Sequence, residues 1–120
     1  MTHTANSSVT RILISAQCGH FCVATDDGEV IFDQIKNALT AGKSVELSFA
    51  GVESLSTAFL NSAIGDLIGI FSLDDLNARL KIEDMSDDDR DTLNRVIANA
   101  KRYYANPDNY RALQRELEAA

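Results

Sequence analysis

Apolar and polar residues alternate along several short stretches of the chain, and this pattern predicts the strands. Residues 44–50 place Val45, Leu47 and Phe49 on one side and polar residues on the other, as expected of a half-buried strand. Further stretches rich in β-branched or alternating apolar residues are also typical of strands: 9–16, 21–24 and 80–85. Because Gly19 supplies a turn between the first two of these, we expect them to pair as a hairpin.

Elsewhere apolar residues recur every three or four positions, which predicts amphipathic helices. Three helices are expected, over about 26–40, 57–71 and 86–105. Asp26 caps the first and Gly42 ends it, while Ser86 and Asp89 form a capping box at the start of the third. The residues expected to face the core are Ile31, Ile35, Ala38 and Leu39, then Leu60, Ile64, Leu67, Ile68 and Phe71, and finally Leu93, Val96, Ile97, Ala100 and Tyr104.

The expected order of elements is β-β-α-β-α-β-α, followed by an extra C-terminal helix after Pro107. Strand–helix–strand units join parallel strands by right-handed crossovers, whereas a hairpin joins antiparallel strands. We therefore predict an α/β domain in which helices pack on a four-stranded mixed sheet. The domain is expected over residues 9–105, with a disordered lead over 1–8 and an amphipathic helix over 106–120.

Composition and charge narrow the class of function. With 120 residues, 45% of them hydrophobic, the chain is long and apolar enough for one folded domain. The formal net charge is −7 and the basic residues are scattered, which disfavours nucleic acid and membrane lipid as partners but suits a basic face on another protein. No stretch is long and apolar enough to span a membrane, and residues 1–8 lack a hydrophobic signal region, so we expect a cytoplasmic protein.

The sequence contains no G-x-S-x-G elbow, no Walker phosphate loop and no Rossmann glycine pattern. Cys18, His20 and Cys22 stand close together as potential metal ligands, but a zinc site needs a second ligand pair at a defined spacing. The alternative interpretation is two thiols that flank a hairpin turn. We therefore expect a protein that is not an enzyme and that holds no cofactor and no metal.

The most informative stretch is 45–61, where a buried strand passes through a short turn directly into a helix. The three hydroxyl residues Ser54, Ser56 and Thr57 fall at that opening. A helix N-terminus has unpaired N–H groups, so hydroxyls are favoured there as caps, and a phosphate is tolerated there as well. Thr57 and Ser56 are thus either candidate phospho-acceptors or plain caps.

Two segments, D-G-E-x-I-F-x-x-I over 27–35 and V-E-L-S-F-A-G-V-E-S-L-S-T-A-F-L-N-S-A-I-G over 45–65, carry a family resemblance. They resemble the STAS fold family, and in particular a STAS-like domain group of uncharacterised function found in bacteria. The resemblance covers roughly residues 9–97. It implies regulation through protein–protein contact, as in the anti-sigma factor antagonists of the wider family.

In those antagonists the comparable strand and turn run into Asp-Ser-Ser/Thr-Gly, and an anti-sigma kinase with a histidine-kinase-type ATPase fold phosphorylates the first hydroxyl. The matching positions here are Ser56, Thr57, Ala58 and Phe59, so the resemblance implies that Thr57 is the acceptor. Three positions depart from the pattern, because Ser56 replaces the Asp, Ala58 the second hydroxyl and Phe59 the Gly. The departure at Phe59 is expected to place a large ring where a partner would approach.

We therefore expect a regulatory module that docks a kinase-like or sensor partner, with partner switching by phosphorylation as a possible control. The expected partner-binding residues are those of the loop–helix junction and of the polar helix face that follows it: Ser54, Ser56, Thr57, Asn61, Ser62, Gly65 and Asp66. Gly65 and Gly69 would admit either a partner helix or the C-terminal helix of the same chain. The alternative functions are a nucleotide or small-anion sensor at the same helix N-terminus, and a self-associating structural subunit that forms a homodimer.

Overall fold

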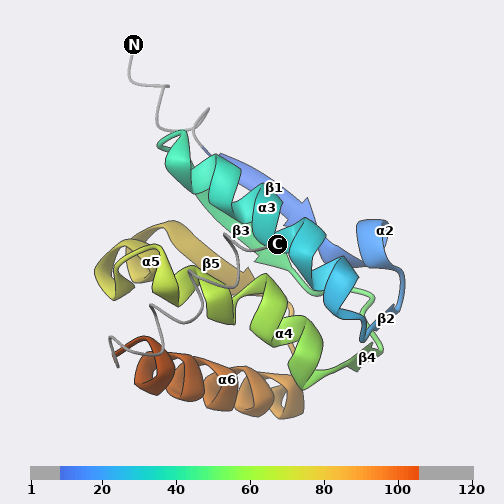
Figure 1. Ribbon diagram of the computed structural model, residues 1–120. Helices are drawn as coiled ribbons and strands as arrows, with labels where there is room; N and C mark the ends of the chain where they lie inside the picture. Colours follow the sequence, from blue (N-terminus) through green and yellow to red (C-terminus); the bar gives the residue numbers. More distant parts are fainter. Residues whose placement is uncertain (1–8, 106–120) are drawn as a thin grey trace.

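Alternating apolar residues build a three-stranded parallel sheet at the centre of the molecule. The computed structural model, which describes residues 9–105, places β3 (Ser44–Ser48) between β1 (Val9–Leu13) and β5 (Leu80–Glu83) (Figure 1). The strand register aligns Ile12, Leu47 and Ile82, so one face of the sheet is apolar. The other face carries charges, with Arg11 2.6 Å from Glu46 and Lys81 3.6 Å from Glu83.

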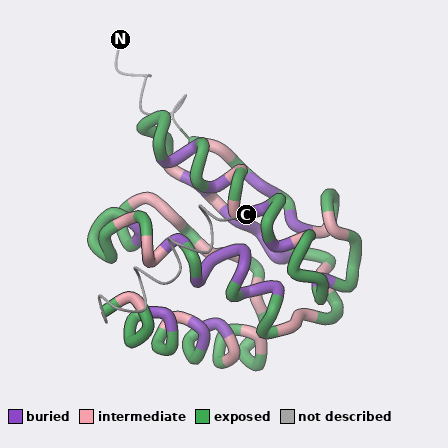
Figure 2. Tube along the Cα trace, viewed as in Figure 1, coloured by how far each residue is buried: buried purple, intermediate pink, exposed green. Residues whose placement is uncertain are grey.

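Helices cover the apolar face and close the core. The longest are α3 (Thr25–Thr40) and α6 (Asp87–Ala105), and α4 (Thr57–Ala63) lies between them (Figure 1). The 3₁₀ helix η1 (Gly65–Gly69) and α5 (Leu73–Arg79) connect α4 to β5. Buried residues line the sides of α3, α4 and α6 that face the rest of the molecule (Figure 2). None of the helices in the described range is long and apolar enough to cross a membrane.

Most expected elements are confirmed. Val45, Leu47 and Phe49 are buried on one side of β3, as their alternation predicts. The expected core residues of the first helix, Ile31, Ile35, Ala38 and Leu39, are all buried on α3. Ser86 caps α6, because its hydroxyl accepts a 3.2 Å hydrogen bond from the N–H of Asp89. The lead over 1–8 and the helix over 106–120 lie outside the described residues.

The expected hairpin is wrong, and with it the four-stranded mixed sheet. The first strand ends at Leu13, and the chain turns into the short helix α2 (Ile14–Cys18), where the side chain of Ile14 is fully buried. Gly19, with φ of 76°, ends this helix. The chain is thereby carried away from β1, so β2 (Phe21–Cys22) pairs in parallel with β4 (Ser54–Leu55) in a separate two-stranded sheet.

Two helix predictions also need correction. The single helix expected over 57–71 is divided at Ile64 into α4 and η1, where Gly65 and Gly69 have low helix propensity and pack closely on α6. Asp26 does not cap α3, because the helix begins one residue earlier with Ala24 at its N-cap and no side-chain cap bond. Asp26 lies instead in the first turn, where its charge favours the helix dipole.

Candidate functional site

The loop–helix junction is held in place by the segment around β2. After β3 the chain turns at Gly51, whose φ of 83° suits glycine. The carbonyl oxygen of His20 then accepts hydrogen bonds from the N–H groups of Glu53 and Ser54, at 2.7 and 3.1 Å. The Nδ1 of His20 lies 2.7 Å from the carbonyl oxygen of Gly51. The junction therefore depends on residues that lie about thirty positions earlier in the chain.

Ser56 and Thr57 have different roles in the structure. The hydroxyl of Ser56 accepts a 3.0 Å hydrogen bond from the N–H of Phe59 and donates a 2.9 Å bond to the carbonyl oxygen of Val23. It therefore caps α4 and also ties the start of this helix to the segment that follows β2. Thr57, by contrast, is exposed, and so is Ser54. Of the two candidate acceptors, Thr57 is the one whose modification leaves the cap intact.

The expected obstruction by Phe59 is wrong. The side chain of Phe59 is fully buried in the core, among the largest residues there. A helical residue two positions after Thr57 points to a different side of α4, and here that side faces the interior. The approach to Thr57 is therefore open.

Sequence reasoning missed two apolar residues beside this junction. Phe21 is 63% exposed and Val23 is 51% exposed, whereas Cys22 between them is buried. Phe21 is in register with Ser54 on the neighbouring strand, and Ser56 bonds to the carbonyl of Val23. We call Phe21, Val23 and the exposed hydroxyl residues Ser54 and Thr57 the β2–β4 surface, because Ser54 lies opposite Phe21 and Thr57 directly follows Ser56. In the sequence, the signal for this surface was the alternation of Phe21, Cys22 and Val23. This alternation predicted a strand, but the strand was expected to pair with the wrong neighbour.

Ser62 and Gly65 are buried, so the exposed position expected for them is wrong. The hydroxyl of Ser62 lies 3.1 Å from the carbonyl oxygens of Thr25 and Phe59, and it packs against Gly28 of α3. A Cβ atom on Gly28 would lie 1.9 Å from that hydroxyl, so only glycine fits there. These small residues let the two helices approach closely.

Gly65 faces α6 rather than another protein. A Cβ atom on Gly65 would lie 3.3 Å from a methyl group of Val96, and one on Gly69 would lie 2.5 Å from the ring of Tyr104. Of the two interpretations of these glycines, the structure therefore supports packing against a helix of the same chain. That helix is α6, and the extra helix expected after Pro107 lies outside the described residues.

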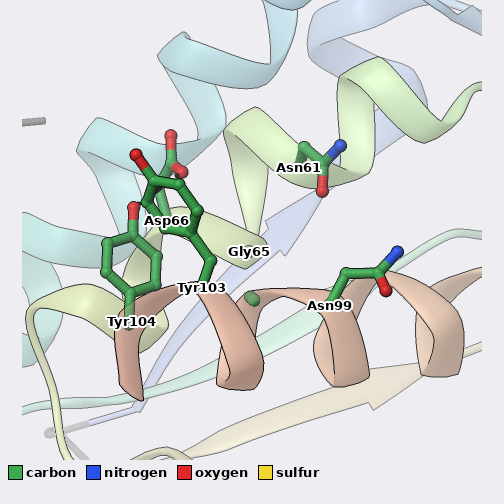
Figure 3. Close-up of a pocket in the computed structure, with 7 residues that line it drawn as sticks. Asn61, Gly65, Asp66, Asn99, Tyr103 and Tyr104 are labelled. Carbon is green, nitrogen blue, oxygen red and sulfur yellow. Dashed lines mark hydrogen bonds between the residues drawn. The ribbon is translucent and has the colours of Figure 1, made fainter. Parts of the chain in front are cut away.

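Asn61 and Asp66 remain exposed and line a hollow between α4, η1 and α6 (Figure 3). We call this the α4–α6 hollow; it has a volume of about 320 Å³ and is lined by Asn61, Gly65, Asp66, Asn99, Ala100, Tyr103 and Tyr104. The hydroxyl of Tyr104 donates a 3.2 Å hydrogen bond to Oδ1 of Asp66. Partial burial raises the pKa of the Asp66 carboxyl group, and the bond from Tyr104 opposes that rise.

The two cysteines have the character of structural thiols. Both are free; Cys22 is buried, and this burial raises its pKa to about 11. Burial also raises the pKa of Cys18, with a smaller contribution from Asp27. Thiols that stay protonated are poor nucleophiles and poor metal ligands. Among residues 9–105 no group of three His, Cys, Asp or Glu side chains is arranged to hold a metal ion.

Comparison with known proteins identifies one family. The family described as a STAS-like domain of unknown function (DUF4325) matches residues 27–90, which is more than half of the chain. The matched range includes most of α3 and all of β3, the loop–helix junction and α4. No curated protein and no solved structure shows significant similarity to the chain.

Proposed function

We propose a regulatory function on one premise: this chain belongs to the STAS-like domain family (DUF4325). The protein acts as a non-catalytic interaction module in the cytoplasm, in the manner of an anti-sigma factor antagonist. It docks a kinase-like partner with a histidine-kinase-type ATPase fold, or a sensor protein, through the Ser54–Asn61 junction. One observation supports this above all: the β2–β4 surface presents exposed apolar side chains directly beside exposed hydroxyls.

The apolar half of the β2–β4 surface supplies the affinity in this proposal. Phe21 is 63% exposed, and aromatic residues are enriched in the buried centre of protein–protein interfaces. Complete burial of such a side chain contributes roughly 1.5–3 kcal/mol. Val23 extends the same apolar patch. Phe21 and Val23 therefore act as anchors, and the neighbouring hydroxyls fix the orientation of the partner.

The hydroxyl half supplies the control. Thr57 is the proposed phospho-acceptor because it is exposed, whereas the hydroxyl of Ser56 is engaged in two hydrogen bonds. A phosphate on Thr57 carries close to two negative charges and would stand beside the apolar contact made by Phe21 and Val23. Desolvating such a group against an apolar interface is unfavourable, so phosphorylation releases the partner.

Affinity capture from the native host tests this function. The full chain should retain a partner that Phe21→Ser and Thr57→Glu lose, because the first removes the anchor and the second mimics the phosphate charge. Ile70→Ser is the matched control, since Ile70 is 53% exposed and follows η1, beyond the C-terminal end of α4. Retention of every partner by both test variants, at unchanged affinity, would contradict the proposal. Intact-mass measurement of protein from that host reports whether the chain carries phosphate, and loss of the added mass in Thr57→Ala would assign the phosphate to Thr57.

A further inference from the structure

We infer that the α4–α6 hollow receives an arginine side chain from the partner protein. This inference rests on the proposed function, since it assumes that the surface around α4 docks a protein. It goes further by naming a second contact, away from the β2–β4 surface, and the residue type that fills it. Thr57 and Asn61 are one helical turn apart and both exposed, so a single partner can reach from one contact to the other.

The shape of the hollow suits one long side chain. Its floor is formed by Gly65 and Ala100, which are both buried and have almost no side chain. A Cβ atom on Gly65 would already lie 3.4 Å from Oδ1 of Asn61 and 3.9 Å from Ala100, so any larger residue there would fill the space. Pockets for drug-sized molecules span about 300–1,000 Å³. With about 320 Å³, this hollow lies at the small end of that range.

One end of the hollow is suited to a planar cation. Asp66 and Tyr103 gather there, and Tyr104 donates its hydroxyl hydrogen to only one of the two carboxylate oxygens (Figure 3). The negative charge of Glu29 on α3 also acts to raise the pKa of the Asp66 carboxyl group, so it adds to the negative potential at this end. A guanidinium group forms paired hydrogen bonds with a carboxylate and stacks on an aromatic ring. A compact ammonium group has no face to stack, so the geometry favours arginine over lysine.

The other end is suited to the backbone of the partner. Asn61 of α4 and Asn99 of α6 present amide groups there (Figure 3). Oδ1 of Asn99 already accepts a hydrogen bond from Arg102, which leaves the amide hydrogens of Asn99 to donate. The positive charge of Arg102 disfavours a second cation at this end. An arginine therefore enters with its guanidinium toward Asp66 and its peptide group toward the two asparagines.

Charge disfavours a phosphate group and a second copy of the chain as occupants. A phosphate group would meet the carboxylate of Asp66 with Glu29 behind it, which disfavours a nucleotide in this hollow. A second copy of the chain carries the same formal charge of −7, so its approach is opposed by like charges. A protein that offers an arginine complements both the local charge and the charge of the whole chain.

Titration of the ¹⁵N-labelled full chain, followed by NMR, tests the assignment. The probe is the capped peptide acetyl-Gly-Arg-Gly-amide, and the matched probe replaces arginine with citrulline, which keeps the shape and removes the charge. We expect saturable shifts of Gly65 and of the side-chain amides of Asn61 and Asn99, with a dissociation constant of the order of 1 mM. Citrulline and lysine peptides should bind at least tenfold more weakly, about the effect of one lost charged contact.

Variants make the test specific. Asp66→Asn preserves the shape and should weaken the arginine peptide about tenfold, while Asp74→Asn, an exposed acid on α5, should change nothing. Tyr103→Leu provides a second variant and should also weaken binding. Equal binding of the citrulline peptide, no effect of Asp66→Asn, shifts spread outside the hollow, or saturable binding of ATP there would each overturn the inference.

The two proposals fail in different ways. If the arginine peptide does not bind but Phe21→Ser still loses the partner, the hollow is wrongly assigned and the docking function stands. If the peptide binds the hollow but neither Phe21→Ser nor Thr57→Glu affects partner capture, the β2–β4 surface is wrongly assigned. Each result therefore addresses one proposal.

Discussion

The two ends of α4 differ, although the sequence gives both ends small polar residues. At its start, Thr57 is exposed and follows Ser56, which bonds to the carbonyl of Val23, whereas at its end Ser62 is buried against Gly28 of α3. The residue types do not explain the contrast. What separates the two ends is the opposing element. Gly28 packs directly against Ser62, whereas Val23, which opposes Ser56 at the start of the helix, is 51% exposed. Small polar residues on a helix therefore do not by themselves distinguish a closely packed surface from an exposed one. The element that lies opposite them must be known.

The contrast between the two phenylalanines gives the largest expected effect. Phe59→Ala should lower the free energy of unfolding by about 3–5 kcal/mol, because its fully buried ring leaves a cavity. Phe21→Ala should change it by no more than about 0.5 kcal/mol, because its ring is 63% exposed. Urea unfolding of both variants measures this. A large loss for Phe21→Ala would mean that the β2–β4 surface is structural.

The sealed end of α4 is tested by Gly28→Ala. The added methyl group would lie 1.9 Å from the hydroxyl of Ser62 and 2.7 Å from the carbonyl oxygen of Phe59, so α3 and α4 must separate. We expect a loss of about 2–3 kcal/mol in urea unfolding. Glu29→Ala, at the exposed neighbouring position, is the control and should stay within about 0.5 kcal/mol. Equal stability of the two variants would show that the helices are not in close contact.

The open end of α4 is tested by its two hydroxyl residues. Ser56→Ala should cost about 1 kcal/mol of stability, because the cap of α4 and the bond to Val23 are both lost. Thr57→Ala, one residue later and exposed, should cost less than about 0.5 kcal/mol. Thermal unfolding of the pair measures the difference. If Thr57→Ala were the more harmful of the two, the separation of structural and accessible hydroxyls would be wrong.

The α4–α6 hollow gives the smallest expected effect on stability. The pKa of Asp66 is raised from 3.8, so the folded state disfavours the ionised carboxylate, and wild-type stability falls as pH rises through that group's titration. Asp66→Asn removes this loss and keeps an acceptor for Tyr104. The variant should melt slightly above wild type at pH 7, and the gap should close below pH 3.8. If the difference in melting temperature between the variant and wild type widened on acidification, the folded state would favour the ionised carboxylate of Asp66, contrary to this prediction.

Local patterns predicted the elements better than the pairing between them. The alternation in β3, the apolar spacing in α3 and the capping box at Ser86 each depend on neighbours within a few residues, and each was confirmed. The strand that pairs with β2 depends on α2, because this short helix carries the chain away from β1. The β-branched run that begins at Val9 concealed the start of α2 at the buried Ile14. In the candidate site, the exposure of Thr57 and Asn61 followed from sequence, but the burial of Ser62 required knowing that Gly28 lies opposite.

In the proposed likeness to anti-sigma factor antagonists, Ser56 aligns with an aspartate, and a serine hydroxyl can donate a hydrogen bond that a carboxylate cannot. A carboxylate would cap α4 equally well, but it is ionised at neutral pH and has no proton to give. The carbonyl of Val23 would then lose its donor, whereas the backbone bonds from Ser56 to Cys22 and from Glu53 and Ser54 to His20 would remain. The serine thus adds a side-chain bond between the start of α4 and the segment that follows β2, and a change to aspartate would remove this bond while leaving the helix cap intact.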